Sequence, residues 1–135
     1  MITVKEVWTK KEQRAFVRFP EKLYKGSECY VPMLYAGEFA IFDPASPFNK
    51  VCDSICFLAY DGDTVVGRIQ GIIQRMANEK WDQKRVRFTR FDAIDDETVS
   101  SALFSAVESW AKAKGMEEFV GPLGYSDLER EGLLI

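Results

Sequence analysis

The chain has 135 residues, of which 47% are hydrophobic and 29% charged, and its net charge is −3 at neutral pH. This length predicts a single domain with its own hydrophobic core. A negative net charge gives no general attraction to nucleic acid or to an anionic membrane, and no apolar run is long enough to span a bilayer. The sequence contains no histidine, which excludes Ser-His-Asp and Cys-His catalysis within this chain.

The three cysteines, Cys29, Cys52 and Cys56, form an odd set without the spacing of a disulfide framework. Three thiolates are also too few for a structural zinc site, so we predict no metal. The N-terminus enters a strand pattern directly and shows no signal peptide. We therefore expect reduced thiols and a cytoplasmic protein.

The first fifty residues predict one strand, one helix and an irregular aromatic segment. Residues 2–7 alternate between apolar and polar side chains, as in a strand. Thr9 can cap a helix over residues 10–19, which we expect Pro20 to interrupt. Residues 20–50 are rich in aromatic rings, with a short helix near residues 33–42. These rings could line an acceptor pocket, but we favour the view that they cover one end of the sheet, because aromatic side chains bury well anywhere.

A β-hairpin follows. Residues 55–60 are apolar on both faces, which predicts a central strand, and Asp61-Gly62 is typical of a hairpin turn. The returning strand, residues 65–73, should place Val65 on the same face as Ile69 and Ile73. Gly67 and Gly71 within it indicate a bulge or a close approach of another backbone.

The next segment is locally basic. Between Gln74 and Arg90 there are six basic residues and two acidic ones, which gives a local net charge of +4. Such a group could contact phosphates or an acidic partner, or could be a solvated, partly helical connection over residues 76–84. The fourth strand then follows, over residues 85–92. Strict alternation predicts that Phe91 shares the face of Arg87 and that Arg90 shares the face of Asp92.

A long helix is the clearest element of the sequence. Asp95, Asp96 and Glu97 supply its cap and an acidic first turn, and Gly115 ends it. Apolar side chains recur at helical spacing in Val99, Leu103, Val107 and Trp110. Their burial stabilises the fold by roughly 8 kcal/mol in all. A strand over residues 119–123 follows, and a helical crossover of this kind predicts that it runs parallel to the fourth strand.

Three local patterns, in this order of elements, resemble the GNAT (GCN5-related N-acetyltransferase) family. They are the hairpin Phe57–Ile69, the apolar pair Leu103-Phe104 in the long helix, and the helix end Ala111–Met116. The chain also resembles the N-terminal part of longer, uncharacterised GNAT-like proteins. The resemblance implies an α/β fold with a mixed five-stranded sheet and helices on both faces. Residues 1–135 would form one domain, truncated before the family's closing helix and strand pair.

The resemblance implies an acyl-CoA-dependent N-acetyltransferase, in which an amine attacks the thioester directly. Acetyl-CoA would rest its pyrophosphate on the start of the long helix. The matching cofactor-binding positions are Phe91, Ala93, Ile94, Thr98, Val99 and Ser100.

The acidic residues Asp95, Asp96 and Glu97 stand where that pyrophosphate should dock. At about 5 Å and an effective dielectric constant near 20, each like-charge pair costs roughly 3 kcal/mol, more than the roughly 0.3–2 kcal/mol from a helix start. This conflict keeps an alternative open, a non-catalytic GNAT-like module that binds a ligand or a protein.

Two residues are candidates for catalysis. Asp92 lies where some family members keep an acidic base, and Tyr125 could donate a proton; Glu38 is a weaker acidic candidate. Each has a structural alternative: an Arg90–Asp92 ion pair, a Tyr125 ring packed beside Pro122, and a solvated glutamate. The acceptor amine is open. Because closing elements are missing and residues 133–135 are apolar, we expect self-association or a further domain of a longer chain.

Overall fold

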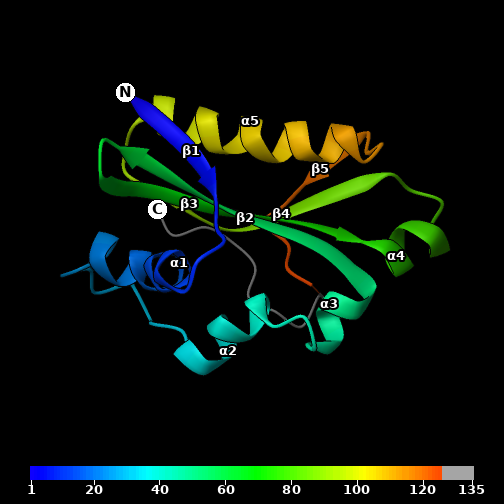
Figure 1. Cartoon of the computed structure of the whole chain (residues 1–135), viewed down its shortest axis with the longest axis horizontal. Coiled ribbons are helices and arrows are strands. Elements are labelled where there is room, and N and C mark those ends of the chain that lie inside the picture. Colours follow the sequence, from blue (N-terminus) through cyan, green and yellow to red (C-terminus); the bar gives the residue numbers. More distant parts are fainter. Residues whose placement is uncertain (126–135) are drawn as a thin grey trace.

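The computed structural model describes residues 1–125 as a five-stranded sheet covered by helices on both faces (Figure 1). The strand order is β1-β2-β3-β4-β5, and every neighbouring pair is antiparallel except the parallel pair β4–β5. The strands are β1 (Ile2–Glu6), β2 (Cys52–Asp61), β3 (Thr64–Gln74), β4 (Arg85–Ala93) and β5 (Glu118–Val120). The helices are α1 (Lys10–Leu23), α2 (Tyr35–Phe39), the 3-10 turn η1 (Ala40–Phe42), α3 (Pro47–Val51), α4 (Arg75–Lys80) and α5 (Glu97–Ala113). The predicted fold class is confirmed.

Helix α5 covers one face of the sheet along its length. Val99, Leu103 and Val107 are fully buried, as their spacing predicted. They lie so close to β3 that a Cβ on Gly67 would be 2.8 Å from Leu103 Cδ1, and one on Gly71 would be 2.9 Å from Val107 Cγ1. Such distances are well inside ordinary van der Waals contact. The two glycines therefore mark a close approach of helix and strand.

Helix α1 packs on the opposite face and does not stop at Pro20, so that prediction was wrong. The helix continues to Leu23 because the Phe16 carbonyl, to which Pro20 cannot donate, accepts a hydrogen bond from another donor. Proline has no N–H to offer the carbonyl four residues earlier. The Phe16 carbonyl instead accepts a hydrogen bond from Arg68 Nη1 at 2.9 Å. The guanidinium of Arg68 also lies over the Phe16 ring, 5.0 Å from its centre.

The β2–β3 hairpin forms as predicted, but a bulge changes one face of β3. Tyr60 pairs with Val65 and Ala59 with Gly67, which leaves Val66 as the extra residue. Val65 consequently packs in the core under α1, whereas Ile69 packs under α5. The prediction that they share a face was wrong, because strict alternation cannot anticipate a bulge.

A second bulge, in β4, changes which residues share a face of that strand. Arg68 pairs with Asp92 and Gln70 with Thr89, so β4 uses one residue more than β3 over this span. Arg90 sits there with a positive φ of 49°. Beyond the bulge, Phe91 packs toward α5 against Phe104, at 4.7 Å between ring centres. The side chains of Arg90 and Asp92 both reach partners on the face of α1 and α2, so the prediction that they share a face is confirmed. The prediction that Phe91 shares the face of Arg87 was wrong, because Arg87 bonds the Gly124 carbonyl on the other face.

The parallel pairing of β4 and β5 is short. It runs from Arg85–Glu118 to Arg87–Val120 and ends where Gly121 lies against Phe88. A Cβ on Gly121 would be 2.5 Å from the Phe88 carbonyl oxygen, so only glycine fits. The chain then crosses to the face of α1–α3, where Tyr125 joins the core (Figure 1). The apolar residues 133–135, on which the expected self-association partly rests, lie outside the described residues.

None of the helices formed by residues 1–125 is both long and apolar enough to cross a membrane.

Candidate functional site

The outer edge of β4 is hydrogen-bonded to described residues up to Phe88 and not beyond it. Arg85–Arg87 pair with β5, and the segment after β5 adds one more hydrogen bond, donated by Leu123 N–H to the Phe88 carbonyl at 2.8 Å. Among residues 1–125, the pairing of β4 with β5 extends no further. The remaining length of β4, Thr89–Ala93, is therefore a strand edge that β5 and residues 121–125 leave uncovered.

Register shows which backbone groups this edge presents. Ile94 N–H donates to the Val66 carbonyl at 3.0 Å, so Ile94 points its backbone groups toward β3. Because the groups of successive residues in a strand point to alternate sides, Ala93 and Phe91 present their N–H and C=O groups outward. Phe91 and Ala93, two of the predicted cofactor-binding residues, thus lie on the open edge. We call these outward backbone groups the β4 open edge.

The first turn of α5 follows directly after this edge, and its own residues use its donors. Asp96 caps the helix: its Oδ1 accepts from Thr98 N–H at 2.9 Å. The Asp96 carbonyl accepts from Val99 N–H at 3.0 Å and from Ser100 N–H at 3.2 Å. The Ser100 hydroxyl donates to the Glu97 carbonyl at 3.1 Å. The three predicted pyrophosphate donors are therefore already bonded within the helix start, and a carboxylate occupies the place expected for a phosphate.

Asp92 lies on the face of α1, and both of its carboxylate oxygens are engaged. Oδ1 accepts from the Tyr24 hydroxyl at 2.6 Å, and Oδ2 accepts from Arg68 Nε at 2.9 Å. Burial and the bond to Asp92 raise the pKa of Tyr24, so this phenol stays protonated. The predicted alternative, an Arg90–Asp92 pair, was wrong in its partner, because the bulge in β4 points Arg90 at Glu38.

Arg90 and Glu38 form a second buried ion pair. Arg90 Nε and Nη2 donate to the two Glu38 oxygens at 2.9 and 3.2 Å, and Arg90 Nη1 donates to Gln70 Oε1 at 2.8 Å. Only 4% of Glu38 is exposed, so the view that it is a solvated glutamate was wrong. The pair fixes α2 to the bulge in β4.

Tyr125 lies at the other end of the same network. Gln70 Nε2 donates to its hydroxyl at 2.8 Å, and the hydroxyl donates to Asn49 Oδ1 at 3.2 Å. Its ring stacks on Phe48 with 5.1 Å between centres. Burial raises the pKa of Tyr125 and keeps it a neutral phenol. The two candidate catalytic residues share a face of the sheet, but the bonds described here place them in separate networks.

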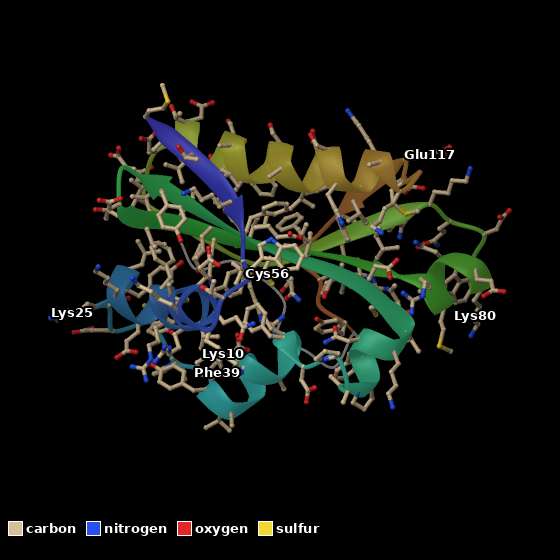
Figure 2. All side chains as sticks on the ribbon, in the orientation of Figure 1. Lys10, Lys25, Phe39, Cys56, Lys80 and Glu117 are labelled. Carbon is tan, nitrogen blue, oxygen red and sulfur yellow. The ribbon has the colours of Figure 1, made fainter. Side chains whose placement is uncertain are left out.

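The basic residues of the 74–90 segment do not gather into a free positive patch. Arg85 pairs with Glu118 at 2.9 Å and Lys84 with Glu117 at 3.7 Å, while Arg75 pairs with Asp53. Figure 2 shows Lys80 on α4, well apart from Glu117 near the end of α5. The local charge of +4 counted along the sequence is thus offset by acidic residues from other elements.

Cys56 lies centrally between the sheet and the helices of the lower face (Figure 2). Burial raises the pKa of its thiol to about 12, so it is not a nucleophile at neutral pH. Within residues 1–125, no three His, Cys, Asp or Glu side chains are placed to hold a metal ion.

Several solved structures share this fold. The chain matches an aminoglycoside acetyltransferase from an uncultured soil metagenomic sample with a TM-score of 0.58 and 12% identity, over 88% of this chain and 75% of that one. It matches FeeM, an N-acyl amino acid synthase from uncultured soil microbes, with a TM-score of 0.60 and 13% identity, over 90% and 74%. A putative acetyl transferase from Pyrococcus furiosus matches with a TM-score of 0.58 and 11% identity, over 100% and 97%. The chain has the GNAT N-acetyltransferase fold, as the sequence resemblance predicted.

Two curated proteins are similar in sequence over nearly the whole chain. Protein YghO of Escherichia coli strain K12 is 30% identical over 132 residues, which cover 98% of this chain and 34% of that protein. The bacterial ceramide synthase of Caulobacter vibrioides is 30% identical over 136 residues, which cover 99% and 35%. The chain thus spans about a third of the length of these relatives, in line with the predicted likeness to part of longer proteins. No family model matches the chain.

Sequence reasoning missed Tyr24 and Arg68 as partners of Asp92. Neither residue is near Asp92 in the sequence; Tyr24 is 68 positions away and Arg68 is 24. One signal was present for Arg68: an arginine on an otherwise apolar strand needs a buried anion or carbonyl. Nothing in the sequence pointed to Tyr24.

Proposed function

We propose that the chain is the thioester-binding part of an N-acyltransferase, and that the acyl donor lies along the β4 open edge. The observation that carries the proposal is the end of β4–β5 pairing at Phe88, which leaves the outward groups of Phe91 and Ala93 to a ligand. The pantetheine arm of acyl-CoA is an extended chain with two amides in series. An extended amide chain can bond to a strand edge as another strand would.

The reaction proposed is direct transfer. The amine nitrogen attacks the thioester carbonyl carbon, the C–N bond forms, and the C–S bond breaks. The thiolate leaves and is protonated, and the ammonium loses a proton. Asp92, which lies between Phe91 and Ala93 in β4, is our proposed acceptor of that proton, and Tyr125 remains the proposed donor. Outward N–H groups at the edge would stabilise negative charge on the thioester oxygen.

The names of the relatives support amide formation as the reaction class. One structural neighbour is described as an N-acyl amino acid synthase and one sequence relative as a ceramide synthase. Both names describe products in which an acyl group is bound to an amine. The chain spans about a third of the length of its sequence relatives. The acceptor amine and the activity of the whole protein therefore belong to the proposal.

A second function is favoured by a different observation. Asp96 occupies the helix start and bonds Thr98 itself, as expected of a GNAT-like module that no longer transfers acyl groups and binds a ligand or protein instead. Proline substitution at the open edge separates the two functions. Ala93→Pro removes an outward N–H and breaks no bond to β3, so the fold should tolerate it.

The assay is calorimetric titration of the chain with S-acetylpantetheine. The acyltransferase proposal expects binding by the wild type, at least a tenfold loss in Ala93→Pro, and an unchanged affinity in a matched control, Val4→Pro. Val4 lies on β1, the outermost strand, and pairs with Ala59 of β2. Val7 N–H donates to the Cys56 carbonyl of β2, so alternation along β1 points the Val4 N–H outward. Absence of any thioester binding by the folded wild type would refute the acyltransferase proposal.

A further inference from the structure

Within residues 1–125, the β4 open edge is closed at one end and free at the other. At Phe88 it is closed by the hydrogen bond from Leu123 and by the contact with Gly121. At the other end, the chain passes from Ala93 through Ile94 into the first turn of α5. A thioester arm lying on Phe91 and Ala93 must therefore leave toward Asp95, Asp96 and Glu97.

The surface at that exit is acidic and its donors are used. Asp95, Asp96 and Glu97 are all exposed, and the Asp96 carboxylate bonds the Thr98 N–H that an incoming phosphate would need. None of the ion pairs formed among residues 1–125 includes these three carboxylates. Three arginines of β3 and β4 are committed to other carboxylates: Arg68 to Asp92, Arg90 to Glu38, and Arg85 to Glu118.

From these two observations we infer that the donor is a pantetheine thioester without the nucleotide diphosphate of CoA, and that the start of α5 discriminates against that diphosphate. This inference rests on the proposed function and narrows its substrate class. The shared chemistry is the acyl-pantetheine arm; its source can be a small thioester, a phosphopantetheine group, or CoA itself. Attraction at the open edge is common to all three, whereas repulsion at Asp95–Glu97 grows with the phosphate charge.

Three probes that carry the same acetylated arm distinguish these sources. S-acetylpantetheine is uncharged, S-acetyl-4′-phosphopantetheine adds one phosphate, and acetyl-CoA adds the diphosphate and ribose phosphate. We expect affinity to fall in that order, by at least tenfold between the first probe and the last at low ionic strength. The gap should shrink in 1 M salt, because screening weakens interactions between exposed charges.

A charge-removing variant tests the cause. Asp95→Asn, Asp96→Asn and Glu97→Gln together remove three negative charges, and asparagine caps a helix about as well as aspartate. This variant should bind acetyl-CoA at least tenfold more tightly than wild type, with S-acetylpantetheine unchanged. The control variant, Asp63→Asn, Glu108→Gln and Glu117→Gln, removes the same charge from exposed positions elsewhere and should keep the wild-type order.

The outcomes separate this inference from the function beneath it. Acetyl-CoA binding as tightly as S-acetylpantetheine, or more tightly, overturns the inference and leaves the acyltransferase proposal standing. An acetyl-CoA affinity that the charge-removing variant does not raise overturns the assignment of α5 as the discriminating element. Failure of all three probes to bind folded protein overturns the inference and the proposed function together.

Discussion

The buried pair Arg90–Glu38 should be a main stabiliser of the site, and Glu38→Gln tests this. The substitution keeps the size of the side chain but removes its charge. In the pair, two donors of Arg90 lie 2.9 and 3.2 Å from the Glu38 oxygens, and the side chains are 11% and 6% exposed. Loss of one partner of a buried pair costs about 3–5 kcal/mol. Gln70 still accepts from Arg90, so we expect the lower end, about 3 kcal/mol.

Urea denaturation at 25 °C measures this loss. With an m value of about 1.5 kcal/mol per M, the midpoint should fall by about 2 M. The matched control is Glu117→Gln, which makes the same chemical change in the pair Lys84–Glu117. That pair spans 3.7 Å and its side chains are 65% and 72% exposed, so its loss should cost about 0–1 kcal/mol. Equal midpoints for the two variants would refute the argument that burial makes the Glu38 pair important.

Three further predictions concern packing, capping and pH. Gly67→Ala should lower the free energy of unfolding in urea by about 1–3 kcal/mol, because its Cβ would be 2.8 Å from Leu103 Cδ1. The control Gly37→Ala has nothing within 4 Å of its Cβ and should not destabilise. An unchanged free energy of unfolding in Gly67→Ala would count against the close approach of α5 and β3. Asp96→Ala should cost about 0.5–2 kcal/mol by thermal melting and Asp96→Asn much less; equal melting temperatures for the two variants would contradict the capping role. Burial raises the pKa of Cys56 from 9.0 to about 12, so the unfolded chain releases this proton first and stability should fall between about pH 9 and pH 12. Cys56→Ala should flatten that fall, and an unchanged pH profile would argue against the shift.

The sequence predicted the elements well because their signals are local. The α5 pattern, its Asp96 cap, the Gly62 turn and the parallel crossover all follow from neighbouring residues, and the structure confirms them. The glycines of β3 were predicted to mark a bulge or a close approach of another backbone. The structure has a bulge directly before Gly67, and side chains of α5 rather than a backbone lie close to Gly67 and Gly71. These features depend on spacing and backbone preference, which a sequence records directly.

The errors have a common physical cause, which is that distant residues decide them. Pro20 does not end α1 because Arg68, far along the chain, satisfies the Phe16 carbonyl. The faces of β3 and β4 shift because each strand carries a bulge. A single extra residue redirects Arg90 from Asp92 to Glu38, and no periodicity shows where that residue is inserted.

The candidate site was therefore only partly predictable. The resemblance predicts Phe91 and Ala93 as cofactor-binding residues, but the open edge on which they lie depends on where the pairing of β4 with β5 stops. That point depends on Gly121, whose contact with Phe88 joins residues 33 positions apart. The acidity of the α5 start, in contrast, was visible in the sequence. It survives in the structure, where none of the ion pairs among residues 1–125 includes Asp95, Asp96 or Glu97.

Binding of a thioester arm to the outward backbone groups of Phe91 and Ala93 underlies the proposed function. The most direct measurement is an amide NMR titration of the chain with S-acetylpantetheine. We predict that the amide signals of Phe91 and Ala93 shift and gain protection from hydrogen exchange, while that of Thr98, already bonded to Asp96, stays in place. Shifts confined to Thr98, Val99 and Ser100, with β4 unchanged, would contradict the claim.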